Sequence, residues 1–291
     1  MPPALRWSVQ TGLGHESQSS PLFQITPESS VIYLPGLQRR SGTHGLARVE
    51  AQTHMAMPEG QSLSTRLEWM GKRSPASPGF DMGSWQVQPT WHWSAAGAGW
   101  GLGTTLQRIA VVGSHFRDVS GVQASWVLPH EHGFWTAVVD LGRYRHKGPL
   151  ADLDASARSL MVMRRWDIGE EGTHWLEGVT LSALAGRERN ARGFDELSYR
   201  QILFSAAVEG NGSGWDWTLR LSALRARFDG SVFAGDSLRR DRSHMLDATV
   251  QWPLPDKAAV RVEWNLALNR SGIRVFNNHY RQVSVWWVQS F

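Results

Sequence analysis

The last residues of the chain, Tyr280–Phe291, read Y-R-Q-V-S-V-W-W-V-Q-S-F. In steps of two from the terminus, one side carries Phe291, Trp287, Val285 and Val283, and the other carries Ser290, Ser284 and Gln282. A period of two predicts a strand with one apolar and one polar face. Terminal residues of soluble domains usually fray, so a final strand that ends on Phe291 indicates an apolar environment around the carboxyl terminus.

The same alternation recurs along the chain from Leu5 onward, in about fourteen runs of about ten residues each. In one of the clearest runs, Val260, Val262 and Trp264 alternate with Arg261 and Glu263. A strand of a soluble sandwich shows this pattern once or twice. Alternation along a whole chain requires lipid or a core on one side of the sheet and polar surroundings on the other.

The connections between these runs alternate in length. The long ones are expected at His15–Gly42, Ser74–Gly83, Gly113–Gly121, Lys147–Asp154, Asn190–Ser198, Ser231–Ser243 and Ser271–His279. The short ones are expected at Pro58–Gly60, Ala95–Gly99, Pro129–Gly133, Ile168–Gly172, Asn211–Gly214 and Pro253–Asp256. Long external loops, short periplasmic turns and an even strand number resemble bacterial outer-membrane barrels. We therefore predict an all-β fold: a single transmembrane antiparallel up-and-down β-barrel over residues 1–291, in the bacterial outer membrane, with Phe291 as the signal for the barrel assembly machinery.

Composition is consistent with this fold and excludes several classes. The chain is 41% hydrophobic and has no cysteine, so it has neither a disulfide framework nor a thiolate metal site. It contains no apolar run of about 18 residues, which excludes a transmembrane helix. The amino terminus has no signal-peptide core, so we expect a mature form. The net charge of +4 comes from dispersed basic residues, so nucleic acid is not an expected partner.

No motif of a known catalytic class occurs in the chain, since G-x-S-x-G, H-E-x-x-H and phosphate-loop patterns are all missing. His130 and His132 form an H-x-H, but two histidines in a predicted turn do not make a metal site. We therefore expect no enzyme activity, no metal and no cofactor.

Polar residues occupy the face expected to point inward, and they are the candidate pore-lining residues. They are Arg6, Arg48, Glu50, Arg66, Glu68, His92, Asp140, Arg220, Asp247, Arg261 and Glu263. A wall with both signs of charge suits water and solutes better than a packed core. The long first loop, residues 15–42, carries apolar residues such as Phe23 and Tyr33, and is the candidate plug or lid.

The outward face changes along each run from tryptophan near the short turns to arginine near the long loops. About eight to twelve residues separate Trp100 from Arg108, Trp135 from Arg143 and Trp175 from Arg187, which matches an apolar band of roughly 25 Å. Indole rings favour the headgroup level. The arginines are expected to form a belt that binds lipopolysaccharide phosphates. Its proposed members are Arg73, Arg108, Arg143, Arg187 and Arg225. Ordinary solvated arginines at the bases of loops are the alternative.

Two stretches carry a resemblance to a known family. The opening L-R-W-S-V-Q-T-G-L-G-H-E-S and the closing hairpin that ends in N-N-H-Y-R-Q-V-S-V-W-W-V-Q-S-F are similar to the fourteen-stranded barrel domain of the surface lipoprotein assembly modifier family. That resemblance implies a translocon-like barrel that helps lipoproteins reach the cell surface, with a periplasmic or lipoprotein partner. A monomeric general-diffusion porin is the second hypothesis, and a structural barrel occluded by its first loop is the third.

Overall fold

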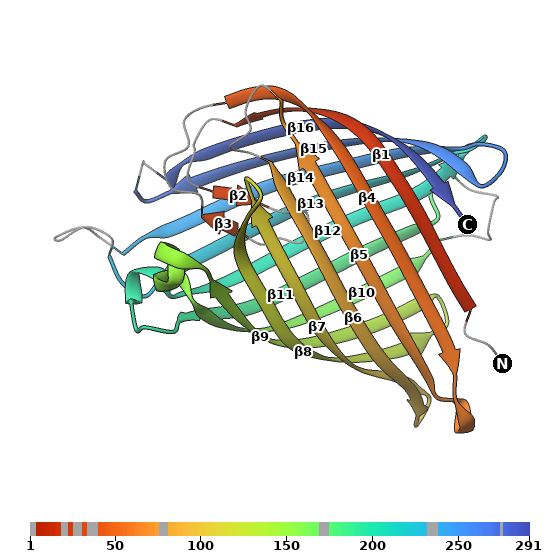
Figure 1. The fold of residues 1–291 in the computed structure, drawn as a ribbon. Coiled ribbons are helices and arrows are strands. Elements are labelled where there is room, and N and C mark those ends of the chain that lie inside the picture. The colour runs from red at the N-terminus through yellow and green to blue at the C-terminus, as the bar shows by residue number, and fades with distance from the viewer. Residues whose placement is uncertain are drawn as a thin grey trace.

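The computed structural model describes residues 4–18, 23–25, 31–33, 40–75, 81–168, 175–231, 238–273 and 276–291. In these residues the chain forms a closed barrel of fourteen antiparallel strands (Figure 1). Each barrel strand pairs with its neighbours in sequence, and β1 (Ala4–Gln18) closes the barrel on β16 (Asn278–Ser290). The predicted up-and-down barrel is confirmed.

The strands between β1 and β16 are β4 (Arg40–Ala56), β5 (Ser62–Arg73), β6 (Met82–Ala95), β7 (Ala98–Val111), β8 (Ser114–His130), β9 (Gly133–His146), β10 (Ala155–Asp167), β11 (Gly178–Asn190), β12 (Tyr199–Gly212), β13 (Trp215–Phe228), β14 (Arg240–Pro253) and β15 (Ala258–Ser271). Short 3-10 turns η1 (Pro58–Gly60), η3 (Gly148–Leu153) and η4 (Asp195–Leu197) lie in the connections. In the described part of the chain, no helix has the length and apolar character to cross a membrane.

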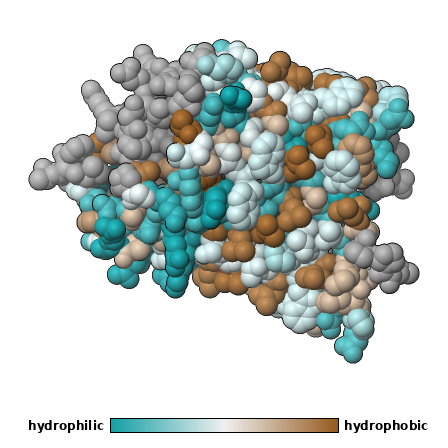
Figure 2. All heavy atoms as spheres, in the orientation of Figure 1, coloured by the Kyte–Doolittle hydropathy of each residue, from teal (hydrophilic) through white to brown (hydrophobic). Residues whose placement is uncertain are grey.

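The outer face of the barrel is apolar and exposed. Leu13, Leu106 and Phe204 expose 67%, 51% and 60% of their surface, and their strands alternate these side chains with inward-facing polar ones. Figure 2 shows hydrophobic residues along the barrel wall, while hydrophilic residues gather toward the end that carries the long connections. A water-exposed wall of this kind is unfavourable, so the band is the surface that contacts lipid.

Both chain termini lie at one end of the barrel, which we call the turn end (Figure 1). Tight turns occur there, such as Ala96–Gly97, where both residues have positive φ of 53° and 74°. Aromatic rings gather at the same end: the Trp93 and Trp100 centroids are 6.5 Å apart. Trp7 stacks on Phe291 at 3.9 Å, and the Phe291 N–H donates to the Trp7 carbonyl oxygen at 2.9 Å. The last residue is therefore fixed to the first strand.

The predicted long connection Gly113–Gly121 is wrong. β7 ends at Val111, the two-residue turn Val112–Gly113 has positive φ at both positions (53° and 72°), and β8 begins at Ser114. The misprediction has a physical cause: β8 here extends past the apolar band, so its outward positions carry Asp118 and Ser120 and the hydrophobic alternation disappears. A bulge between Ile109 and Ala110 further disturbs the period.

The predicted first loop, residues 15–42, is shorter than expected, because β1 continues to Gln18 and β4 begins at Arg40. Between them, β2 (Phe23–Ile25) and β3 (Val31–Tyr33) form a separate hairpin. Figure 1 shows this hairpin at the barrel end opposite the termini, which we call the loop end. The other residues from 19 to 39 lie outside the described part, so the role of the loop as a plug stays a prediction.

Candidate functional site: the barrel interior

The register of the sheet places all the candidate pore-lining residues on the inner face. One face of β4 and β5 carries Arg48, Glu50, Arg66 and Glu68. The cross-strand registers place the other candidate pore-lining residues on the same, inner face of their strands. Some of these residues meet and others do not. The charged residues of β4 and β5 contact one another, whereas His92 instead lies 2.9 Å from the Ser64 hydroxyl. Their role in lining a pore remains a prediction.

A ladder of ion pairs runs across β4 and β5. Arg48 Nη2 lies 3.0 Å from Glu68 Oε1, and Arg66 Nη2 lies 2.8 Å from Glu50 Oε1 and 3.0 Å from Glu68 Oε2. These side chains are 13% to 43% exposed, so they are accessible from the lumen rather than packed in a core. We call these four residues the charge ladder. It presents both signs of charge to the interior at one level of the barrel.

The charged surface continues across the seam between the first and last strands. Arg261 Nε lies 2.9 Å from Glu263 Oε1, and Arg261 Nη2 donates to Gln10 Oε1 on β1 at 2.6 Å. The indole N–H of Trp286 donates to Glu263 Oε2 at 2.9 Å. Trp286 is 6% exposed and points inward, so a tryptophan forms part of the lumen wall. The predicted pore-lining residues are all polar and do not include Trp286.

Gly12 makes room for that indole. Gly12 and Trp286 are direct cross-strand partners, and a Cβ on Gly12 would lie 3.0 Å from Trp286 Cδ2 and 2.5 Å from the Val285 carbonyl oxygen. The contact with the carbonyl oxygen is too short for a real side chain, and the contact with the indole is very tight. The ring can therefore cover β1 from inside because β1 has no side chain at that position.

A cavity of about 500 Å³ lies in the lumen between two unlike walls. Arg220 and Asp247, which are direct cross-strand partners on β13 and β14, contribute the charged side. Met161 and Leu184 contribute to the uncharged side on β10 and β11. A second cavity of about 370 Å³ includes Asp140. The interior thus contains several voids lined by polar and apolar groups together, in contrast to a close-packed core.

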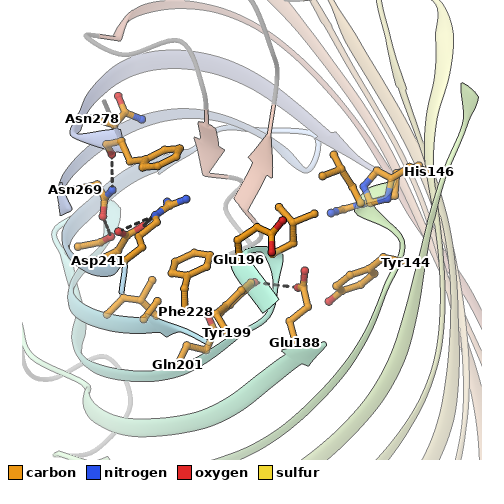
Figure 3. Close-up of a pocket in the computed structure, with 18 residues that line it drawn as sticks. Tyr144, His146, Glu188, Glu196, Tyr199, Gln201, Phe228, Asp241, Asn269 and Asn278 are labelled. Atoms are coloured by element: carbon orange, nitrogen blue, oxygen red, sulfur yellow. Dashed lines mark hydrogen bonds and ion pairs between the residues drawn. The ribbon is translucent and has the colours of Figure 1, made fainter. Parts of the chain in front are cut away.

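A third cavity, of about 320 Å³, lies at the loop end of the barrel (Figure 3). We call it the mouth pocket. Its lining includes Tyr144, Glu188, Tyr199, Phe228, Arg239 and Asp241. Figure 3 shows Glu188 between the two tyrosines, with Phe228 and Asp241 on the opposite side of the pocket. Most of these residues project from the ends of β9, β11, β12, β13 and β14.

On one side of the mouth pocket, an acidic group is surrounded by aromatic rings. The Tyr199 hydroxyl donates to Glu188 Oε2 at 2.9 Å. Arg117, which is 5% exposed, lies with Cζ 5.0 Å from the centre of the Tyr144 ring. A cation over an aromatic face is attracted to the ring quadrupole. This side of the pocket therefore combines a carboxylate, a guanidinium and two phenol rings.

The other side of the mouth pocket is built around an arginine. Arg239 Nε donates to Asp241 Oδ1 at 3.0 Å and to Oδ2 at 3.1 Å. The guanidinium Cζ lies 4.2 Å from the Phe228 ring centre and 3.7 Å from that of Phe276. The Asn269 side chain donates to the Phe276 carbonyl oxygen at 2.9 Å, and this hydrogen bond holds the backbone of Phe276 in place. Arg239 and Asp241 lie within the predicted long loop Ser231–Ser243 and were not among the predicted site residues.

No three His, Asp or Glu side chains gather closely enough to hold a metal ion within the described ranges. Of the two histidines of the H-x-H, His130 is the last residue of β8 and His132 lies in the β8–β9 turn. The proposed lipid-binding arginines, Arg73, Arg108, Arg143, Arg187 and Arg225, have the outward parity of their strands. They are therefore on the surface that faces lipid rather than in the lumen.

No protein-family model and no curated protein matches the chain. Solved structures do match. A loop-deletion mutant of OmpT, an outer membrane protein of Vibrio cholerae, aligns with a TM-score of 0.52 at 7% identity and covers 99% of both chains. OccK7 (OpdD) of Pseudomonas aeruginosa aligns at 0.50 with 8% identity, and an anion-selective porin from Comamonas acidovorans at 0.50 with 10% identity, each over 99% of both chains.

The chain thus has the fold of bacterial outer-membrane β-barrels, and the prediction of an outer-membrane barrel is confirmed at that level. Because the sequence identities are only 7% to 10%, these structures show a shared fold and nothing more. Nothing in these comparisons supports the resemblance to surface lipoprotein assembly modifiers beyond the barrel itself.

Proposed function

We propose that the protein is an outer-membrane pore that passes small hydrophilic solutes. The observation that supports this most directly is the inner surface, where the charge ladder and the Arg261–Glu263 pair present accessible groups of both signs. Buried ion pairs would be costly in a closed core, but side chains that remain partly exposed keep their water. Such a wall is suited to solutes that are themselves hydrated.

The two sides of the lumen differ in polarity, which suggests how the pore orients the solutes that pass through it. Charged residues of β15, β4 and β5 line one side, and Met161 and Leu184 lie on another. Arrays of charge above low-dielectric walls focus an electric field across a narrow space. A polar solute with an apolar portion can therefore turn its polar groups to the charged side. We expect small amphipathic solutes to be favoured over bulky ions.

The translocon reading rests on the family resemblance, and no contact in the described residues favours it over a pore. We expect no enzyme activity, because the sequence carries no motif of a known catalytic class, although the Ser64 hydroxyl lies 2.9 Å from His92 Nε2 in the lumen. The barrel assembly machinery and a periplasmic or lipoprotein partner stay predictions about partners.

Single-channel recording tests the pore. The full chain is refolded and inserted in a planar bilayer, beside a variant that lacks Pro21–Leu37. We expect steady conductance from the full chain and the same or larger conductance from the variant. Conductance that appears only after the deletion would identify a barrel plugged by its first loop. If both proteins insert, as shown by heat-modifiable migration, and neither conducts, the pore is refuted.

A further inference from the structure

Arginines line up in direct cross-strand register on the outer face at the loop end. Arg158 pairs with Arg187, Arg187 with Arg200, and Arg200 with Arg227, across four neighbouring strands. The row continues from Arg227 to Arg240 on β14. Like charges directly opposite each other destabilise a sheet. A row of five such positions therefore calls for a compensating negative charge.

The protein itself supplies little of that charge. Arg187 Nη2 lies 3.1 Å from Asp229 Oδ2, but Arg187 Nε is buried and has no hydrogen-bond partner. Arg143, Arg158 and Arg189 form no ion pair with any residue that the structure describes. Arg143, Arg158 and Arg189 are also exposed. These guanidiniums thus point outward with free donor groups.

A concave site lies among these arginines on the outer wall. Its volume is about 640 Å³, and Arg143, Arg158, Arg187 and Arg189 all line it. Ser120 of β8 and Ser156 of β10, the cross-strand partners of Arg143 at outward positions, form other parts of its lining. Because these two side chains are short, the outer wall leaves a hollow where the neighbouring guanidiniums can converge. We call this hollow the arginine groove.

The level of the groove matches the boundary of the lipid. Leu141 and Leu160 lie two residues from Arg143 and Arg158 toward the turn end and expose 51% and 47% of their surface. Two residues of a strand span about 6.6 Å. The arginines therefore lie just beyond the apolar band, at the height of lipid headgroups, with apolar side chains directly below for acyl chains.

We propose that the arginine groove binds the phosphate groups of an outer-leaflet lipopolysaccharide. Guanidiniums bind phosphate oxygens through paired, charge-assisted hydrogen bonds. A phosphate in the groove neutralises the arginine row, and its acyl chains cover Leu141 and Leu160. This extends the arginine belt expected from sequence to a defined site, and adds Arg158, whose outward position the structure shows.

Lipid A binding tests the site. The full chain is refolded without lipopolysaccharide, and binding is measured in nanodiscs that contain either lipid A with both phosphates or the same lipid without phosphates. The variant is R143Q/R158Q/R189Q, which leaves Arg187 on Asp229. The matched control is K147Q/R192Q/K257Q, which removes the same charge from exposed sites outside the groove.

We expect the groove variant to bind phosphorylated lipid A at least about tenfold more weakly than the control, because each charged hydrogen bond contributes on the order of a tenfold change. Lipid A without phosphates should bind weakly to both proteins. Equal affinity of the groove variant and the control would overturn the proposal, as would equal affinity of the unaltered protein for both lipids. Heat-modifiable migration confirms that each variant is folded.

Discussion

Asp241 is the residue whose replacement has the most predictable energetic effect. Arg239 and Asp241 have side chains that are only 7% and 9% exposed, and the guanidinium lies between Phe228 and Phe276. Asp241→Asn keeps the shape of the side chain but removes its charge, so the buried Arg239 loses the attraction of the Asp241 carboxylate. Removal of one partner of a buried pair costs about 3–5 kcal/mol. The two phenyl rings still stabilise the cation by about 2 kcal/mol, so we expect a loss near the lower limit.

The assay is denaturant unfolding of the refolded barrel in lipid vesicles, followed by tryptophan fluorescence. A double variant, R239M/D241L, replaces the pair with apolar groups and should recover most of the stability, because well-packed apolar replacements of buried pairs are often neutral. A loss below about 1 kcal/mol in Asp241→Asn, with normal folding, would show that solvent screens the pair. A double variant no more stable than the single one would also refute the reasoning.

Three further perturbations follow from the structure. Gly12→Val should destabilise the barrel by about 1–3 kcal/mol in the same unfolding assay, because the new side chain overlaps the Val285 carbonyl and Trp286. The control is Gly42→Ala, which should have little effect because its new methyl group meets nothing within 4 Å. Phe291→Ala removes the Trp7 stack and should cost about 0.5–1.5 kcal/mol in the refolded protein, yet should lower outer-membrane levels in cells severalfold; unchanged levels would contradict an assembly role. R48Q/R66Q removes two lumenal cations and should shift the zero-current potential in asymmetric KCl toward cation selectivity, while K257Q should not.

The sequence predicted the architecture because the barrel imposes one rule on every strand. Where lipid contacts one face and water the other, residues alternate, and the inward parity of Arg48, Arg66 and Glu263 could be read directly. The same rule predicted the outward parity of Arg143 and Arg187. These positions depend only on counting along a strand within the apolar band.

Prediction failed where strands leave that band. At the start of β8 the outward positions Asp118 and Ser120 are polar and the apolar Val119 faces inward, so Ser114–Ser120 resembled a loop. The mouth pocket was missed for the same reason, since Arg239 and Asp241 occupy the loop end, where the alternation gives no signal. Their pairing also depends on Phe276, which is distant in sequence, and no local pattern shows such a contact. Trp286 was missed because an inward-facing tryptophan depends on a glycine in another strand.

The two glycines on the inner face of β1, Gly12 and Gly14, also fix how the barrel closes. Trp286 of β16 lies opposite Gly12, and His44 of β4 lies opposite Gly14. A slip of the last strand by one residue would turn the indole out to lipid. A slip by two would place it against the Gln10 side chain or against the site that His44 already fills. The strands that close the barrel are the two segments farthest apart in the sequence. Their pairing can therefore adopt only one register, in which the Trp286 indole of the last strand covers the Gly12 position of the first.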